Sequence, residues 1–137
     1  MTTEPLRKGD VFYYPYLWRW QRNEGIPHGK DRTCCLAFTF STRESEQLLI
    51  VIAISDSKTG IALEIPVPER KLAGLRVDRP AFLHLDEYNI DPLVGSFDRH
   101  PKPRVLGRFS RQFMNKVTQQ LADNIKAGRS KGNDRRQ

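Results

Sequence analysis

Residues 47–54 read QLLIVIAI, an almost unbroken apolar segment rich in β-branched side chains. This composition predicts a central β-strand that is buried on both faces. The earlier segment 32–40 (RTCCLAFTF) has the same strand-forming character and predicts a second strand. The fold is therefore expected to form around a β-sheet.

Shorter strand-like segments and turns surround this centre. Further strands are expected at residues 10–17, 60–67 and 80–85, with a short closing strand at 105–109. Residues 18–31 and 91–103 are rich in Gly, Pro and charged side chains, so both are expected to be loops.

One helix is expected near the C-terminus, over about residues 110–126. Ser110 can cap its N-terminus, apolar side chains then recur at helical spacing, and Gly128 can end it. Several short strands and one helix predict a single, mainly β domain over residues 1–126 that forms a small, strongly bent barrel.

Composition limits the class of protein. The formal charge is +7, and residues 126–137 hold five basic residues and one acidic residue, so we expect 127–137 to be a disordered basic tail. No apolar segment approaches the roughly 20 residues of a membrane-spanning helix, and no signal peptide is evident. Two adjacent cysteines cannot form the disulfide framework of a small secreted protein. A soluble, cytoplasmic protein is expected.

Several short motifs, taken in order, resemble the MazF/PemK (Kid-like) family of toxins from bacterial toxin–antitoxin pairs. The motifs are Lys8-Gly9-Asp10-Val11-Phe12, Arg32-Thr33-Cys34-Cys35-Leu36-Ala37, Ile50-Val51-Ile52-Ala53-Ile54-Ser55, Gly74-Leu75, Asp78-Arg79-Pro80, Asn89-Ile90-Asp91 and Gly107 with the helix that follows. The resemblance covers about residues 7–126 and depends on the order of the motifs rather than on any one of them.

The resemblance implies an SH3-like β-barrel of the MazF/PemK/CcdB type with a C-terminal helix, assembled as a homodimer. It implies sequence-selective cleavage of single-stranded RNA without a metal or other cofactor. It also implies a cognate antitoxin protein that blocks the RNA groove, and binding to operator DNA only through the toxin–antitoxin complex.

Metal-free RNA cleavage needs a base for the ribose 2′-OH, a cation for the phosphate and an acid for the leaving 5′ oxygen. Arg32 is the candidate phosphate ligand because a guanidinium binds phosphate in a bidentate manner, and a surface ion pair is the alternative. Ser55 ends the apolar strand, where its hydroxyl can bind a phosphate oxygen or the 2′-OH, or can cap an ordinary turn.

His84 and Asp86 alternate along one expected strand and so share a face. The carboxylate would raise the pKa of the imidazole and orient it for acid–base chemistry, whereas a structural histidine is the alternative. His28, in the loop before Arg32, is a second acid–base candidate. The spacing of His and Cys predicts no metal site.

The loop before Arg32 combines aromatic and basic side chains that suit single-stranded RNA, since bases stack on rings and cations meet phosphates. The candidate RNA-binding residues are Trp18, Arg19, Trp20, Arg22 and Lys30. The alternative is that the two tryptophans cover the barrel or a dimer interface.

Two other function classes remain open at this point. One is a binding module on the same scaffold that has lost catalysis, which the departures from the family pattern favour, such as Thr33 in place of Pro and Ser55 in place of Thr. The other is a toxin directed at DNA gyrase.

Overall fold

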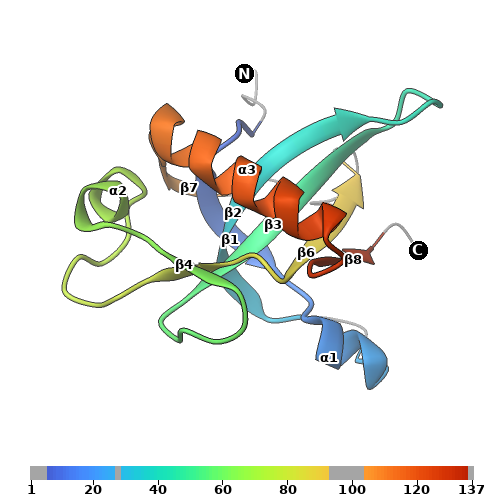
Figure 1. Cartoon of the computed structure of the whole chain (residues 1–137), viewed down its shortest axis with the longest axis horizontal. Coiled ribbons are helices and arrows are strands. Elements are labelled where there is room, and N and C mark those ends of the chain that lie inside the picture. The colour runs from blue at the N-terminus through green and yellow to red at the C-terminus, as the bar shows by residue number, and fades with distance from the viewer. Residues whose placement is uncertain (1–5, 27–28, 93–103, 136–137) are drawn as a thin grey trace.

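The computed structural model describes residues 6–26, 29–92 and 104–135, and these residues form a mainly β fold with a long C-terminal helix (Figure 1). The elements in chain order are β1 (Asp10–Pro15), α1 (Arg19–Asn23), β2 (Asp31–Ser41), β3 (Gln47–Ser55), β4 (Ala62–Glu64), α2 (Val67–Leu72), β5 (Phe82–His84), β6 (Glu87–Pro92), β7 (Val105–Arg108), α3 (Arg111–Lys126) and β8 (Lys131–Asp134).

Strand β3 is the centre of an eight-stranded sheet, as its apolar sequence predicts. The main path runs β4-β5-β3-β2-β1-β7, while β6 also pairs with β3 and β8 pairs with β6. Strand β3 forms antiparallel ladders with three neighbours: with β2, with β6 through Leu48–Val51, and with β5 through Ile54 and Ser55. The β6–β8 pair is parallel. In the described residues no ladder joins β4 to β7, so the path is open.

Apolar side chains cover both faces of this sheet. Ile50 and Ile52 belong to a cluster that also contains Val117 and Leu121 of α3, which lies across β2 and β3 in Figure 1. The opposite face buries a second cluster: Phe12, Tyr14, Tyr16, Cys34, Leu36, Leu49, Val51 and Ala53. Cys34 and Cys35 are therefore both fully buried, on opposite faces, and neither thiol is exposed.

The sheet is strongly curved, because side chains of β1 reach β6. The Tyr14 hydroxyl donates to the Asp91 carboxylate, and the Tyr16 hydroxyl lies 3.2 Å from Glu87 Oε1. Strands β2 and β3 separate β1 from β6 along the path, so a flat sheet would hold β1 and β6 roughly 14 Å apart. The curvature brings the end of β1 against β6 and β8.

The helix prediction for residues 110–126 is confirmed by α3, Arg111–Lys126. Ser110 is the N-cap, and its Oγ accepts a hydrogen bond from the backbone N–H of Phe113 at 3.2 Å. The buried positions of the helix form the expected single stripe: Phe113, Met114, Val117 and Leu121. No helix in the described part of the chain is long and apolar enough to cross a bilayer.

The expectation of a disordered tail at 127–137 is wrong for residues 127–135, since Lys131–Asp134 form β8 alongside β6. Polar bonds hold this segment: the Asn133 amide donates to the Leu17 carbonyl at 3.0 Å, and the Arg135 guanidinium donates to the Pro15 carbonyl. The local sequence does not indicate this ordered segment, because the partners of Asn133 and Arg135 lie more than a hundred residues away along the chain. Residues 136–137 lie outside the described residues.

Further boundaries differ from expectation: the expected strand 10–17 shortens to β1, and the expected strand 80–85 shortens to β5, so Asp86 lies beyond the strand that holds His84. The expected loop 18–31 contains α1 and the first residue of β2. The expected strand 60–67 shortens to β4, because Pro66 and Pro68 cannot continue a ladder and instead open α2. Strand β6 was not expected from the sequence. Its last two residues, Asp91 and Pro92, lie in the expected loop 91–103, of which residues 93–103 lie outside the described residues.

Candidate functional site

Two of the predicted residues, Ser55 and His84, are brought together by the β3–β5 ladder. Ser55 ends β3 and pairs with Phe82, so His84 lies two positions further along β5. The Ser55 Oγ and His84 Nε2 atoms are 2.5 Å apart, a short hydrogen bond. Ser55 is half-buried and His84 is only 3% exposed. The hydroxyl is therefore the more accessible member of the pair.

Burial decides the protonation of His84. Desolvation lowers the pKa of the imidazole, and this effect exceeds the opposing effects of the Asp86 charge and of a hydrogen bond to the Thr59 backbone. The Asp86 charge does raise the pKa of His84, as expected. The overall shift of this pKa is nevertheless downward, so the expected direction is wrong. The imidazole is neutral near pH 7 and can accept a proton.

The hydrogen bond to the Thr59 backbone favours one tautomer of His84. A bond that raises the pKa of a histidine must stabilise its cation, so the Thr59 backbone acts as an acceptor. Because Nε2 faces Ser55, Nδ1 is the nitrogen left to donate to Thr59. In the tautomer with the proton on Nδ1, Nε2 accepts a hydrogen bond from the Ser55 hydroxyl.

Trp18 connects this pair to Arg32. Its ring lies perpendicular to the His84 ring, with 5.4 Å between centroids, and the Arg32 guanidinium carbon lies 5.8 Å from the Trp18 ring centroid. Trp18 is held as the N-cap of α1, where its backbone N–H donates to Gln21 Oε1 at 3.0 Å. Its ring also packs against Tyr16. Ser55, His84, Trp18 and Arg32 thus form one continuous row of contacts, here called the Ser55–Arg32 row.

Two polar atoms at this site are buried without a hydrogen-bond partner among the described residues, Arg32 Nε and Asp86 Oδ1. Buried polar atoms are nearly always paired, so these two atoms are exceptions among the described residues. Asp86 lies under the Gly60 backbone, where an added Cβ would stand 2.6 Å from Asp86 Oδ2. The turn at 59–60 therefore closes over both Asp86 and His84.

The other candidate RNA-binding residues lie on α1 or, for Lys30, directly before β2, and they are exposed. Trp20 is 56% exposed, and the side chains of Arg19, Arg22 and Lys30 also face solvent. The backbone N–H of Arg19 donates to Glu87 Oε1 at 3.1 Å, which ties α1 to β6. The exposed side chains of Arg19, Trp20 and Arg22 form a basic and aromatic surface on α1, next to Trp18.

The second histidine candidate, His28, lies outside the described residues. Among the residues that the structure describes, no three His, Cys, Asp or Glu side chains come together to hold a metal ion. Sequence reasoning missed Thr59 and Gly60, and also Glu87, whose pKa burial raises. Gly60, which predicts a turn after Ser55, was the feature of the sequence that could have pointed to this segment.

No protein-family model matches the chain, and no curated protein matches its sequence. The function must therefore be argued from the residues and their geometry, together with the motif resemblance.

Proposed function

We propose that this chain is a MazF/PemK-like toxin that cleaves single-stranded RNA without a metal, using the Ser55–Arg32 row. The observation that carries the proposal is that four candidates from separate parts of the sequence lie in one row of contacts. His84 and Ser55 supply a group that can take up and return a proton, Arg32 supplies the cation for the phosphate, and the Trp18 ring can stack on a base.

The proposed scaffold is an SH3-like barrel. Its support is the set of side-chain hydrogen bonds from β1 to β6 and β8, which draw together the two sides of the curved sheet. The Asn89 amide donates to the Leu17 carbonyl at 2.8 Å, and Asn133 donates to the same carbonyl. Barrel closure through side chains in place of a continuous ladder is consistent with these contacts.

In the proposed mechanism, Ser55 passes a proton to His84. The imidazole is almost fully buried, so the ribose 2′-OH approaches Ser55 rather than His84. The 2′-OH gives its proton to Ser55 Oγ while the Ser55 proton moves to His84 Nε2. The 2′ oxygen then attacks the phosphorus, and the nearby Asp86 charge stabilises the imidazolium that forms.

Arg32 stabilises the charge that develops on the phosphate through its guanidinium, since this residue is only half-buried. The bond between phosphorus and the 5′ oxygen breaks, and the proton held by His84 returns through Ser55 to that oxygen. The products are a 2′,3′-cyclic phosphate and a 5′-hydroxyl. Trp18 and the exposed Trp20 offer rings on which bases of the strand stack.

The remaining parts of the proposal follow the resemblance. The toxin acts in the cytoplasm as a homodimer on messenger RNA, a cognate antitoxin blocks its RNA surface, and operator DNA is bound only by the toxin–antitoxin complex. A formal charge of +7 favours both RNA and an acidic antitoxin as partners.

One observation favours the alternative of a binding module without catalysis. The Ser55–His84 bond is short and the imidazole is 3% exposed, an arrangement that also suits a purely structural pair. This module would bind RNA through Trp18, Trp20 and Arg32 and leave it intact.

The deciding experiment maps RNA ends after incubation with purified protein in the presence of EDTA. We expect discrete cuts with 5′-hydroxyl and cyclic phosphate ends, which disappear in Arg32→Ala. The matched control is Arg43→Ala, an exposed arginine between β2 and β3 that should cut as the wild type does. RNA that stays intact, or identical cuts by Arg32→Ala, would contradict the proposal; growth arrest with intact RNA would indicate a gyrase-directed toxin.

A further inference from the structure

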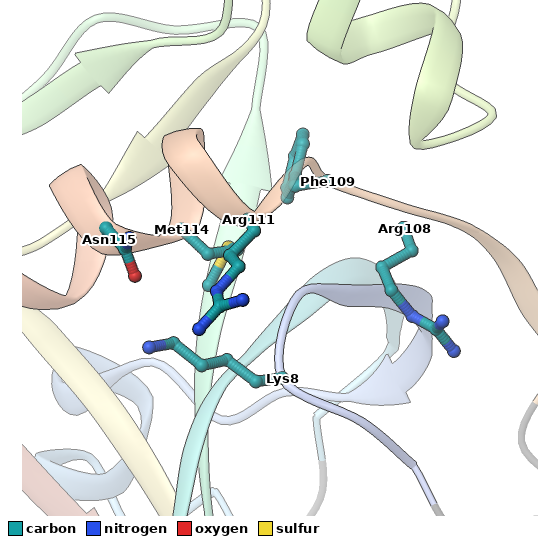
Figure 2. A pocket seen from close by; sticks show the side chains of 6 residues that line it. All are labelled: Lys8, Arg108, Phe109, Arg111, Met114 and Asn115. Carbon is teal, nitrogen blue, oxygen red and sulfur yellow. The ribbon is translucent and has the colours of Figure 1, made fainter.

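A separate pocket lies at the other end of β1 from the Ser55–Arg32 row. It has a volume of about 380 Å³ and is lined by Lys8, Arg108, Phe109, Arg111, Met114 and Asn115 (Figure 2). In the sheet, Asp10 pairs with Arg108 beside this pocket, whereas Tyr14 pairs with Arg32. Four residues of strand span roughly 13 Å, so the two sites are distinct.

The pocket carries uncompensated positive charge. Figure 2 shows the charged ends of Lys8 and Arg111 pointing toward one another within it. Neither forms an ion pair in the part of the chain that the structure describes, whereas Arg108 Nε lies 2.6 Å from Asp10 Oδ1. Two like charges that converge without a carboxylate repel one another, and a bound anion removes that repulsion.

The turn that presents Lys8 is held rigidly by its neighbours. Asp10 is 2% exposed, and its Oδ2 accepts from the Arg7 backbone N–H at 2.7 Å. The Gly9 N–H donates to the Leu36 carbonyl at 2.8 Å, and the Gly9 carbonyl accepts from the Phe109 N–H at 3.1 Å. These bonds position the turn before any ligand arrives.

Gly9 allows the turn to approach α3 closely. Its φ is +92°, and an added Cβ would stand 2.9 Å from Met114 Cγ. Only a residue without a side chain permits both the conformation and the contact. The turn that carries Lys8 is therefore held close to α3, on which Arg111 lies.

We propose that this pocket binds the phosphate group of a nucleotide. The Arg111 guanidinium and the Lys8 ammonium bind phosphate oxygens, and the Asn115 amide, one helical turn beyond Arg111, supplies a neutral donor. Phe109 and Met114 close the base of the pocket but are only 3% and 2% exposed, so the ligand meets mainly the polar side chains. The volume suits a small ligand, because ligand pockets begin at about 300 Å³. The nucleotide is either free or part of an RNA strand, and the site does not depend on the proposed nuclease activity.

The test measures binding of AMP and of a fluorescent 10-nucleotide single-stranded RNA to the full chain by titration. We expect saturable AMP binding that weakens with salt and falls about tenfold or more in Lys8→Ala and in Arg111→Ala. The control is Lys116→Ala, which removes an exposed charge of the same helix outside the pocket. Both pocket residues are exposed, so the variants should fold, which circular dichroism checks.

Loss of RNA affinity in parallel with AMP affinity would assign the site to a bound strand, and loss of AMP affinity alone would assign it to a free nucleotide. The proposal is overturned if neither ligand binds saturably, or if Lys116→Ala weakens AMP binding as much as Arg111→Ala does. A deca-glutamate peptide that binds this pocket more tightly than AMP would also overturn it.

Discussion

The Ser55 hydroxyl is held between a backbone amide and an imidazole. The Ser57 N–H donates to Ser55 Oγ at 3.2 Å, and the hydroxyl proton has two acceptors, His84 Nε2 at 2.5 Å and the Ser57 carbonyl at 3.3 Å. With Nε2 unprotonated, the imidazole is the closer acceptor and the proton points toward it. A hydroxyl oriented in this way transfers its proton without first rotating.

Replacement of His84 by Gln should lower the rate of RNA cleavage by about 10²- to 10⁴-fold, because Gln cannot take up a proton. In the wild type the rate should rise with pH as His84 becomes neutral, with a midpoint below the ordinary pKa of about 6.5, since burial lowers the pKa of this imidazole. Initial rates on one RNA oligonucleotide, measured across pH in both proteins, check this expectation.

The variants at Ser55 provide the control for this assignment. Ser55→Thr retains the hydroxyl and should keep the acid limb of the profile, whereas Ser55→Ala should lose most activity. A folded His84→Gln protein with an unchanged pH profile would remove His84 from the mechanism, whatever the effect of Ser55→Ala.

At the scale of elements, the junction between α2 and β7 depends on two glycines. Gly74 follows α2 with a φ of +73°, and an added Cβ would stand 2.4 Å from the Leu106 carbonyl oxygen. Gly107 of β7 faces the end of α2 in the same way, with the Leu72 carbonyl oxygen 2.3 Å from an added Cβ. Backbone therefore packs directly on backbone at this junction.

Gly74→Ala should destabilise the fold by about 3 kcal/mol or more, because the methyl group adds a clash with backbone to the cost of a positive φ. Gly128→Ala is the matched control: it has the same φ of +73° and no atom within 4 Å of an added Cβ. It should cost only about 1–2 kcal/mol. Urea unfolding curves give both values, and equal losses would show that the contact with Leu106 does not matter.

The elements that could be predicted are those with a local pattern. The continuous apolar sequence of β3 and the apolar residues at helical spacing in α3 both predict which side chains are buried. Strand β6 does not, since its buried positions Glu87, Asn89 and Asp91 are polar and would suit a surface. Their partners on β1 and at Leu17 lie about 70 residues away, and no local pattern reports such a partner.

The same limit applies to the two sites. Arg32, Ser55 and His84 were recognisable one by one from motif and residue type, but their meeting depends on the β3–β5 ladder and on the position of Trp18. Lys8 and Arg111 lie about a hundred residues apart, so nothing in the sequence placed them in one pocket.

At the scale of the whole molecule, buried carboxyl groups hold the curved sheet together. Burial raises the pKa of Asp91 and of Glu87 above their ordinary values near 4. Between the ordinary and the raised pKa, the native state binds more protons than the unfolded chain. The free energy of unfolding contributed by these groups is therefore complete below about pH 4 and falls as pH rises through the raised pKa.

Asp91→Asn and Glu87→Gln should each remove that residue's share of the fall in free energy of unfolding with rising pH, because neither amide ionises. Their free energy of unfolding relative to the wild type should increase as pH rises from about 4, by at most about 1.4 kcal/mol per pH unit for each group. His84 acts in the opposite direction, since its pKa is lowered and its contribution is lost as pH falls. The difference between variant and wild type isolates the carboxyl groups from that effect. For the exposed Asp56→Asn variant, the difference in free energy of unfolding from the wild type should not change with pH. If the difference for Asp91→Asn is also independent of pH, the pKa of Asp91 is not raised by folding.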